Sequence, residues 1–192
     1  MSDGNGRHQQ GNGNRAGKYL TFRLGKEEYG IGILKVREVN AILPITVVPN
    51  TPKYVKGVIN LRGKVVPVID LRTKFGMEPI EYNDRTCIIV VDAELNSQKS
   101  LIGVIVDEVS EVLNIKSDEI EDTPDFGAKV DTSYIIGVAI KGEGVKLLLD
   151  IDEVLSREEI EIPKLLSKEK VELQNSQMCS GESTGLPLEE PV

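Results

Sequence analysis

An internal repeat constrains the fold of this 192-residue chain more than any other feature of its sequence. Residues 54–75 align without a gap on residues 134–155, at an offset of 80. About one identity is expected by chance over such a length at average composition. The alignment instead contains the identical pairs Tyr54/Tyr134, Gly57/Gly137, Val58/Val138, Val65/Val145 and Asp70/Asp150. The chain is therefore predicted to contain two related units.

The repeat continues upstream at an offset of 73, where further residues coincide: Gly30/Gly103, Val36/Val109, Glu38/Glu111 and Val39/Val112. Together the alignments predict units at about residues 18–80 and 84–155. A domain of about 70 residues is only marginally stable by itself. We therefore expect the two units to share a hydrophobic interface, with a groove between them.

Alternation of apolar and polar residues predicts β-strands in both units. In residues 19–24 the apolar side chains alternate with Thr21 and Arg23, which is the pattern of a half-buried strand. Many short strands separated by glycine turns favour small barrels over a doubly wound α/β sheet. Short apolar runs bounded by turn residues predict further strands at residues 87–91, 101–106 and 145–149.

A tight hairpin is predicted between residues 57–60 and 65–69, with Gly63 at a turn position. Proline has no amide hydrogen to donate to a ladder, so Pro67 predicts that its strand lies at a sheet edge or carries a bulge. Arg62 lies beside the turn glycine, where a long charged side chain contributes little to folding. It is either a solvated residue or an anchor for a partner, and the same alternatives are open for Glu38.

Composition differs at the two ends of the chain. Residues 1–17 contain five glycines and three asparagines, so they are predicted to form a disordered tail. Ser156-Arg157-Glu158-Glu159 fits a capping box that opens a helix, and Pro163 would kink or restart that helix. Residues 156–192 are therefore predicted to form an acidic helix followed by a frayed tail.

Charge and residue counts exclude several classes of function. The net charge of −8 argues against a nucleic-acid-binding protein. No apolar run approaches the roughly 20 residues that span a bilayer, and residues 1–17 do not resemble a secretion signal. Two cysteines favour a reducing cytoplasm over a disulfide framework. His8 is the only histidine, which excludes a histidine-based metal cluster and a Ser-His-Asp triad.

An enzymatic interpretation depends on Asp70 and Asp150, which occupy equivalent positions in the repeat. Two carboxylates brought together by a pseudo-two-fold axis could share a proton. Each aspartate also ends an apolar strand and precedes residues that could begin a helical turn, where aspartate is a common cap. We favour the capping interpretation. Cys87 lies in an apolar strand, which favours packing over reactivity, and we predict no metal site.

Three strings of residues resemble the CheW family of chemotaxis coupling proteins: EEYGIGILKVREV at 27–39, NTPKYVKG at 50–57 and GVINLRGKVVPVIDLR at 57–72. The resemblance covers about residues 18–160 in order. It implies a mainly all-β fold of two intertwined, SH3-like, five-stranded barrels, plus a C-terminal helix. It also implies that the protein is a non-enzymatic adaptor without a cofactor.

In this family the adaptor joins the cytoplasmic tips of chemoreceptors to the regulatory domain of the CheA histidine kinase. The resemblance implies a cytoplasmic protein at receptor arrays, without direct membrane insertion. A coupling protein of a chemosensory pathway unrelated to motility is the alternative. Phe126 resembles an aromatic residue that joins such proteins into rings. Carried over by position, the receptor contacts would be Val36, Glu38, Arg62, Cys87 and Val112, and the kinase contacts Ile42, Ile45, Lys56, Gly57 and Phe126.

Overall fold

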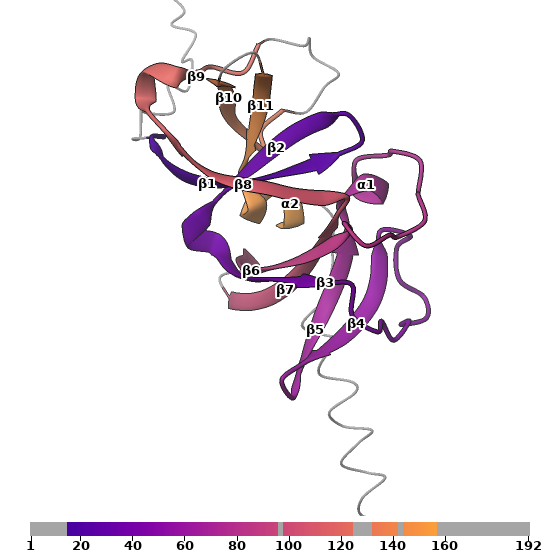
Figure 1. Cartoon of the computed structure of the whole chain (residues 1–192). Coiled ribbons are helices and arrows are strands. Elements are labelled where there is room, and N and C mark those ends of the chain that lie inside the picture. Colours follow the sequence, from indigo (N-terminus) through magenta and orange to yellow (C-terminus); the bar gives the residue numbers. More distant parts are fainter. Residues whose placement is uncertain (1–14, 96–97, 125–131, 142–143, 157–192) are drawn as a thin grey trace, which may run out of the picture. The chain divides into compact units, whose positions relative to one another are not determined.

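The computed structural model describes residues 15–95, 98–124, 132–141 and 144–156, which form two β-sheets with short helices (Figure 1). Sheet A has six strands in the order β8-β1-β2-β11-β10-β9, and sheet B has five in the order β3-β6-β7-β5-β4. The predicted all-β class is therefore confirmed. The strands of sheet A are β1 Gly17–Leu24, β2 Glu27–Gly32, β8 Glu108–Ile115, β9 Ile120–Glu121, β10 Ile135–Lys141 and β11 Gly144–Leu149. Those of sheet B are β3 Val36–Ala41, β4 Val55–Leu61, β5 Lys64–Asp70, β6 Cys87–Leu95 and β7 Gln98–Val106.

Each sheet contains strands from both repeat units, so the units are intertwined as the resemblance implied. The hairpin β1–β2 of the first unit joins β8, β10 and β11 of the second in sheet A. The hairpin β6–β7 of the second unit joins β3, β4 and β5 of the first in sheet B. In Figure 1 the indigo strands β1 and β2 accordingly lie with the orange strands β10 and β11. Neither sheet is made by one unit alone.

A parallel strand pair holds each exchanged hairpin at the same register. In sheet A, β2 runs parallel to β11 with Gly30 opposite Leu148. In sheet B, β7 runs parallel to β5 with Gly103 opposite Val68. A Cβ atom on Gly30 would lie 3.0 Å from Leu148 Cδ2, and one on Gly103 would lie 3.3 Å from Val68 Cγ2. The repeated glycine thus marks a point where the exchanged hairpin closely approaches its partner strand.

The equivalent strands β4 and β10 carry equivalent bulges. The register shifts between Val55 and Gly57 in β4, and at the corresponding pair in β10. Each bulged strand is also bridged from its other side, by Thr46 to Val58 in sheet B and by the two-residue strand β9 in sheet A. The single bridge at Thr46 does not count as a strand. Sheet A therefore has six strands instead of the predicted five.

The predicted hairpin is confirmed. The prediction that the strand of Pro67 lies at a sheet edge or carries a bulge is wrong. β5 lies between β4 and β7 and is therefore internal to sheet B. Its parallel ladder with β7 covers only Val68 to Asp70, and its bulge lies in the partner strand β4. Pro67 is accommodated because it pairs with Val58 of β4 just before the second ladder begins.

Asp70 and Asp150 cap the helices that follow them, as predicted. Asp70 Oδ1 accepts a hydrogen bond from the Thr73 amide at 3.0 Å, at the start of α1 Leu71–Lys74. Asp150 Oδ1 accepts one from the Asp152 amide at 3.0 Å, at the start of α2 Ile151–Ser156. The carboxylates are therefore used in local backbone contacts, which does not favour a proton-sharing pair.

The helix predicted to begin at Ser156 lies beyond the described residues, and within them Ser156 belongs to the end of the preceding helix α2. Ser156 is the last residue of α2, and its hydroxyl donates a hydrogen bond to the Glu153 carbonyl at 3.3 Å. α2 begins at Ile151, where Asp150 provides the cap. The predicted tail and helix over residues 157–192 lie outside the described residues, as do residues 1–14 of the predicted N-terminal tail.

Each sheet encloses its own apolar cluster. Sheet B buries Ile59, Val66, Val68, Ile88, Val90 and Ile105, and sheet A buries Tyr19, Ile115, Ala139 and Leu148. A row of aromatic rings joins elements of the two units: Phe22 and Tyr29 have centroids 5.9 Å apart, Tyr29 and Phe75 6.0 Å, and Phe75 and Tyr134 5.7 Å. Such spacings are typical of favourable aromatic contacts. The expected shared hydrophobic interface thus includes this row.

Replacing Gly103 with alanine should destabilise the protein by about 1–3 kcal/mol, the usual cost of overpacking a core. The added methyl group would lie 2.9 Å from Ile88 Cγ2 as well as against Val68. Gly32→Ala is the matched control, because no heavy atom lies within 4 Å of its Cβ position. The control should change stability by less than about 0.5 kcal/mol. Urea unfolding followed by circular dichroism measures both variants, and equal midpoints would contradict the prediction.

Candidate partner-binding surface

The turn between β4 and β5 exposes the side chain of Arg62. Arg62 has φ 53° and Gly63 has φ 83°, so both central residues adopt the left-handed conformation of a two-residue hairpin turn. The Asn60 Oδ1 atom accepts a hydrogen bond from the Gly63 amide at 2.8 Å and stabilises the turn. A left-handed conformation is unfavourable for arginine by about 1–2 kcal/mol. The turn would accept asparagine or glycine at this position with less strain.

The two charged candidates, Arg62 and Glu38, bind each other. Arg62 Nη2 donates to Glu38 Oε2 at 2.6 Å, and the two side chains are 82% and 21% exposed. Glu38 lies on β3 and Arg62 on the β4–β5 turn, and β3 and β4 are the opposite edges of sheet B. The ion pair therefore joins the two edges of the sheet, and it leaves the guanidinium group accessible to a partner.

A bulge in β3 determines which of its side chains are exposed. Val36 pairs with Val91 and Glu38 with Val90, so Arg37 is an extra residue between them. Arg37 forms an ion pair with Asp92 instead. Val36 and Glu38 are half-buried, whereas alternate residues of the strand are exposed.

The structure places four of the five receptor-contact candidates in one sheet. Cys87 pairs with Ala41 at the end of β3, and its thiol donates a hydrogen bond to the Arg85 carbonyl at 3.1 Å. Val36, Glu38 and Arg62 lie in the same sheet B. Val112 instead lies on β8 of sheet A, where it pairs with Leu20 and is 48% exposed.

The kinase-contact candidates lie around the segment that follows β3. Ile42 and Ile45 are partly buried and pack against the apolar cluster of sheet B. Lys56 Nζ lies 3.4 Å from Thr73 Oγ1 and 3.7 Å from Asp70 Oδ2. Gly57 has φ 140°, and a Cβ atom there would lie 2.0 Å from the Thr46 carbonyl oxygen. Gly57 is buried, so it can act only through the shape of this segment. Phe126 lies outside the described residues.

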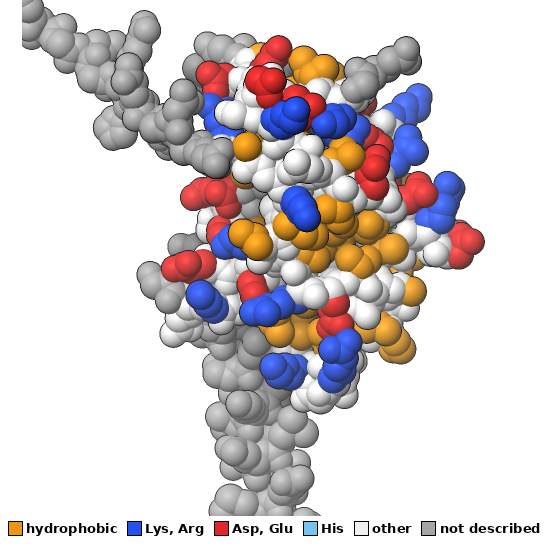
Figure 2. Space-filling view, turned by 60° about the vertical axis from the view of Figure 1, so that its left-hand side comes forward, with side chains coloured by type: hydrophobic (Ala, Val, Ile, Leu, Met, Phe, Trp, Pro, Cys, Tyr) orange, Lys and Arg blue, Asp and Glu red, His pale blue; other side chains and the backbone are white. Residues whose placement is uncertain are grey.

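Three further valines, in sheet B or next to it, have exposed side chains but were not predicted as site residues from the sequence. They are Val39 on β3, Val47 beside the Thr46 bridge, and Val65 on β5. Figure 2 shows hydrophobic side chains grouped on one face of this protein, with charged residues around them. The repeat aligns Val39 with the candidate Val112, and this alignment could have identified Val39 as a site candidate. Val47 and Val65 gave no signal, because valine is common at any strand position.

The side chains of Tyr82 and Asp70 form a structural contact next to α1. Tyr82 donates its hydroxyl hydrogen to Asp70 Oδ2 at 3.0 Å. Burial of the ring and the neighbouring Asp70 carboxylate raise the pKa of Tyr82, so the tyrosine stays a hydrogen-bond donor.

Within the ranges that the structure describes, no three histidine, cysteine, aspartate or glutamate side chains are grouped to hold a metal ion. No helix in the same ranges is long and apolar enough to cross a membrane.

These features define a class of protein: a duplicated pair of SH3-like β-subdomains that exchange hairpins and expose a charged turn. Comparison with known proteins identifies the family. Residues 18–159 match the model of the CheW-like domain, and the chain belongs to this family. This family supplies scaffold and adaptor proteins of chemotaxis.

Individual relatives support the same assignment. The chain is 41% identical over 151 residues to the chemotaxis protein CheW of Klebsiella aerogenes, covering 79% of this chain and 89% of the relative. It is 38% identical over 151 residues to CheW of Rhizobium meliloti, covering 78% and 93%. The crystal structure of the scaffolding protein TtCheW from Thermoanaerobacter tengcongensis matches with a TM-score of 0.63 and 36% identity, covering 72% of this chain and 92% of that one.

Arg62→Asn should leave the free energy of unfolding unchanged or raise it slightly. Asparagine tolerates the left-handed turn position, and this gain should offset the exposed ion pair, which contributes about 0.2–1 kcal/mol. Glu38→Gln removes the same ion pair without relieving the turn, so it should lower stability by about that amount. Urea unfolding of both variants makes the comparison. A larger loss for Arg62→Asn than for Glu38→Gln would show that Arg62 is a structural residue.

Proposed function

We propose that this chain is a non-enzymatic adaptor that couples chemoreceptors to the CheA histidine kinase in bacterial chemotaxis. Membership of the CheW-like family, across residues 18–159, carries the proposal. The capping roles of Asp70 and Asp150 favour a function without catalysis, because each carboxylate already accepts a local backbone hydrogen bond. The adaptor would act in the cytoplasm at receptor arrays, without nucleic acid or direct membrane insertion.

The receptor tip would bind along β3 and the β4–β5 turn. Val36 and Cys87 offer apolar surface on adjacent strands, which contributes about 25 cal/mol per Å² buried before the cost of association. Arg62 and Glu38 would set the register of the receptor helices and exclude wrong partners, as charges at the rim of an interface do. Val112 would extend the contact to sheet A.

The kinase regulatory domain would bind around the segment that leaves β3. Ile42, Ile45 and Lys56 would contribute to this contact, with Gly57 shaping the segment. The exposed side chains of Val65 in sheet B and of Val47 next to it add apolar surface. Phe126 would contribute to a second contact that assembles rings within the array.

The adaptor would act by holding two partners at once. A receptor that binds better to one arrangement of the adaptor and kinase shifts the kinase toward that arrangement. The mutual effect of the two partners is a coupling free energy, which is the same in both directions. Such a mechanism requires rigid contacts and needs no chemical step.

Titration calorimetry of this chain with the regulatory domain of its own organism's CheA-type kinase should show saturable one-to-one binding. Deleting the gene should also abolish receptor control of the kinase while leaving basal autophosphorylation intact. Absence of binding at high micromolar kinase would contradict the proposed partner. Swimming assays of the deletion strain separate the two candidate pathways, because an adaptor of a non-motility pathway would leave taxis unchanged.

Arg62→Glu should weaken receptor binding by about 1–3 kcal/mol, the range expected for a charged anchor residue. The substitution places two carboxylates together at the β3 edge and removes the cation that a receptor would meet. Lys18→Glu is a matched control, because it makes the same charge reversal at an exposed position in sheet A.

The melting temperature of both charge-reversal variants should stay close to that of the wild type. Binding to a receptor fragment in a pull-down or by calorimetry provides the measurement. Equal binding by Arg62→Glu and Lys18→Glu would remove Arg62 from the receptor contact.

A further inference from the structure

The described chain passes between the two sheets at two places. It leaves sheet A after β2 and reaches β3 through η1 Ile33–Lys35. It leaves sheet B after β7 and enters β8 through the single residue Asp107. We call these segments the first and second crossover. Contacts that fix these crossovers therefore also restrain the position of one sheet relative to the other.

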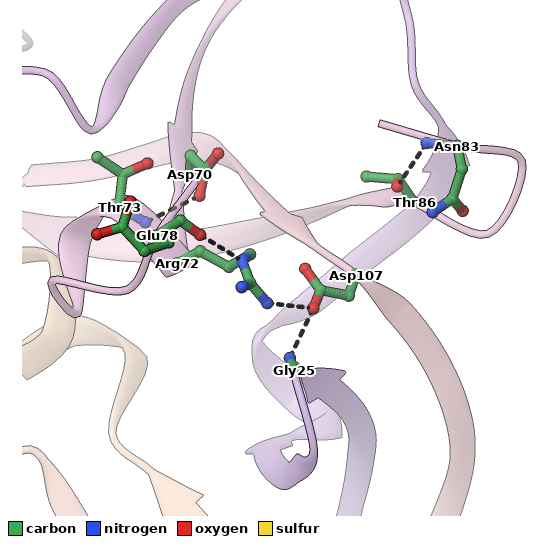
Figure 3. Close-up of polar contacts among 8 residues, drawn as sticks. All are labelled: Gly25, Asp70, Arg72, Thr73, Glu78, Asn83, Thr86 and Asp107. Carbon is green, nitrogen blue, oxygen red and sulfur yellow. Dashed lines mark hydrogen bonds and ion pairs between the residues drawn. The ribbon is translucent and has the colours of Figure 1, made fainter. Parts of the chain in front are cut away.

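The second crossover is held by the carboxylate of Asp107 (Figure 3). Asp107 Oδ2 accepts a hydrogen bond from Arg72 Nη1 of α1 at 2.6 Å and from the Gly25 amide at 2.6 Å. Gly25 lies in the turn between β1 and β2. The Arg72 and Asp107 side chains are only 12% and 18% exposed, so solvent screens their attraction less than that of a surface pair. One carboxylate thus joins a crossover, a helix and the turn of an exchanged hairpin.

The first crossover is held in the same way by Asp152 of α2. Asp152 Oδ2 accepts a hydrogen bond from Lys35 Nζ of η1. Its other oxygen, Oδ1, accepts one from the Glu94 amide at 2.9 Å. Glu94 is the next-to-last residue of β6, beside the turn of the other exchanged hairpin. Hydrogen bonding to Asp152 raises the pKa of Lys35, as expected for a lysine that gains a carboxylate partner.

The two arrangements join corresponding elements, and their charges are opposite in sign. The repeat offset of 80 aligns Arg72 with Asp152, the helix residue of each arrangement. In one, the crossover provides the carboxylate and the helix provides the cation. In the other, the helix provides the carboxylate and the crossover provides the cation. The same three elements are therefore joined at both places by residues that are not identical in the repeat.

We infer that Asp107 with Arg72, and Asp152 with Lys35, are two clamps whose residues position the sheets relative to each other. Each clamp fixes one crossover, and either one alone restrains the pair of sheets. Loss of both leaves the crossover backbone and the apolar interface to maintain the arrangement. On the proposed adaptor function, on which this last step depends, the clamps keep the Val112 surface of sheet A in register with the receptor contacts of sheet B.

Electron–electron double resonance tests the inference on the full chain without any partner. Spin labels are placed at Lys18 of sheet A and Lys64 of sheet B, both exposed, after Cys87→Ser and Cys179→Ser remove the native thiols. Arg72→Met opens one clamp and Lys35→Met opens the other. We expect each single variant to retain a narrow distance distribution. The double variant should broaden that distribution by about twofold. A double variant with the wild-type distribution overturns the inference.

Arg37→Met is the matched control for loss of an ion pair. Arg37 pairs with Asp92 inside sheet B, across β3 and β6, and neither residue belongs to a clamp. Adding Arg37→Met to either single variant should leave the distribution narrow. If this combination broadens it as much as the double clamp variant does, general destabilisation explains the result and the inference is overturned.

Amide hydrogen exchange tests each clamp separately, including the case in which the double variant does not fold. Lys35→Met should speed exchange at the Glu94 amide by about tenfold and leave Gly25 unchanged. Arg72→Met should do the reverse. Unchanged exchange at both amides overturns the inference. Failure of the adaptor proposal would instead appear as absence of kinase binding by the wild type, with both clamp results intact.

Discussion

The parallel pairing of exchanged hairpins is the constraint on which the rest of the structure depends. The contacts of β2 with β11 and of β7 with β5 insert a hairpin of each unit into the sheet of the other. Gly30 and Gly103 allow the close approach that this pairing needs. Since each unit lacks two strands of its own sheet, neither unit can bury its apolar cluster alone. The chain therefore gains one cooperative fold from units too small to be stable separately.

The duplication also shows which features the fold does not need. Glu38 has a counterpart in Glu111, but the position equivalent to Arg62 is Gly142. Sheet A has its own contact near its hairpin, where Lys141 Nζ binds Glu119 Oε1 at 2.7 Å. The Glu38–Arg62 pair is thus present in only one of two equivalent sheets, and its arginine adopts an unfavourable φ. This contrast supports the proposed role of Arg62 in recognition, because strained residues often mark functional sites.

The sequence predicted local features well, but it predicted poorly which strands pair with each other over long sequence separations. Alternation identified strands such as β1, and the Asp70 and Asp150 caps followed from strand ends next to helical residues. The exchange of hairpins came only through the family resemblance, because strand alternation says which face is buried and not which strand is adjacent. Pro67 was misjudged for the same reason, since one residue cannot show how far a neighbouring ladder extends. The short helix α2 was not predicted, although its cap Asp150 was identified, because six residues are too few to show a helical period.

The arrangement of sheet B suggests how the proposed adaptor would transmit a signal. Glu38, a receptor candidate, and Ile42, a kinase candidate, belong to one continuous segment, β3 and the residues that follow it. β3 is paired with β6 without interruption from Glu38 to Ala41, and packed strands shift between discrete arrangements more readily than they bend. A receptor that pulls on the Glu38–Arg62 edge would then move the kinase-binding segment with it. In this mechanism the coupling free energy between the receptor and kinase contacts depends on a rigid strand, and it requires no flexibility between the two contacts.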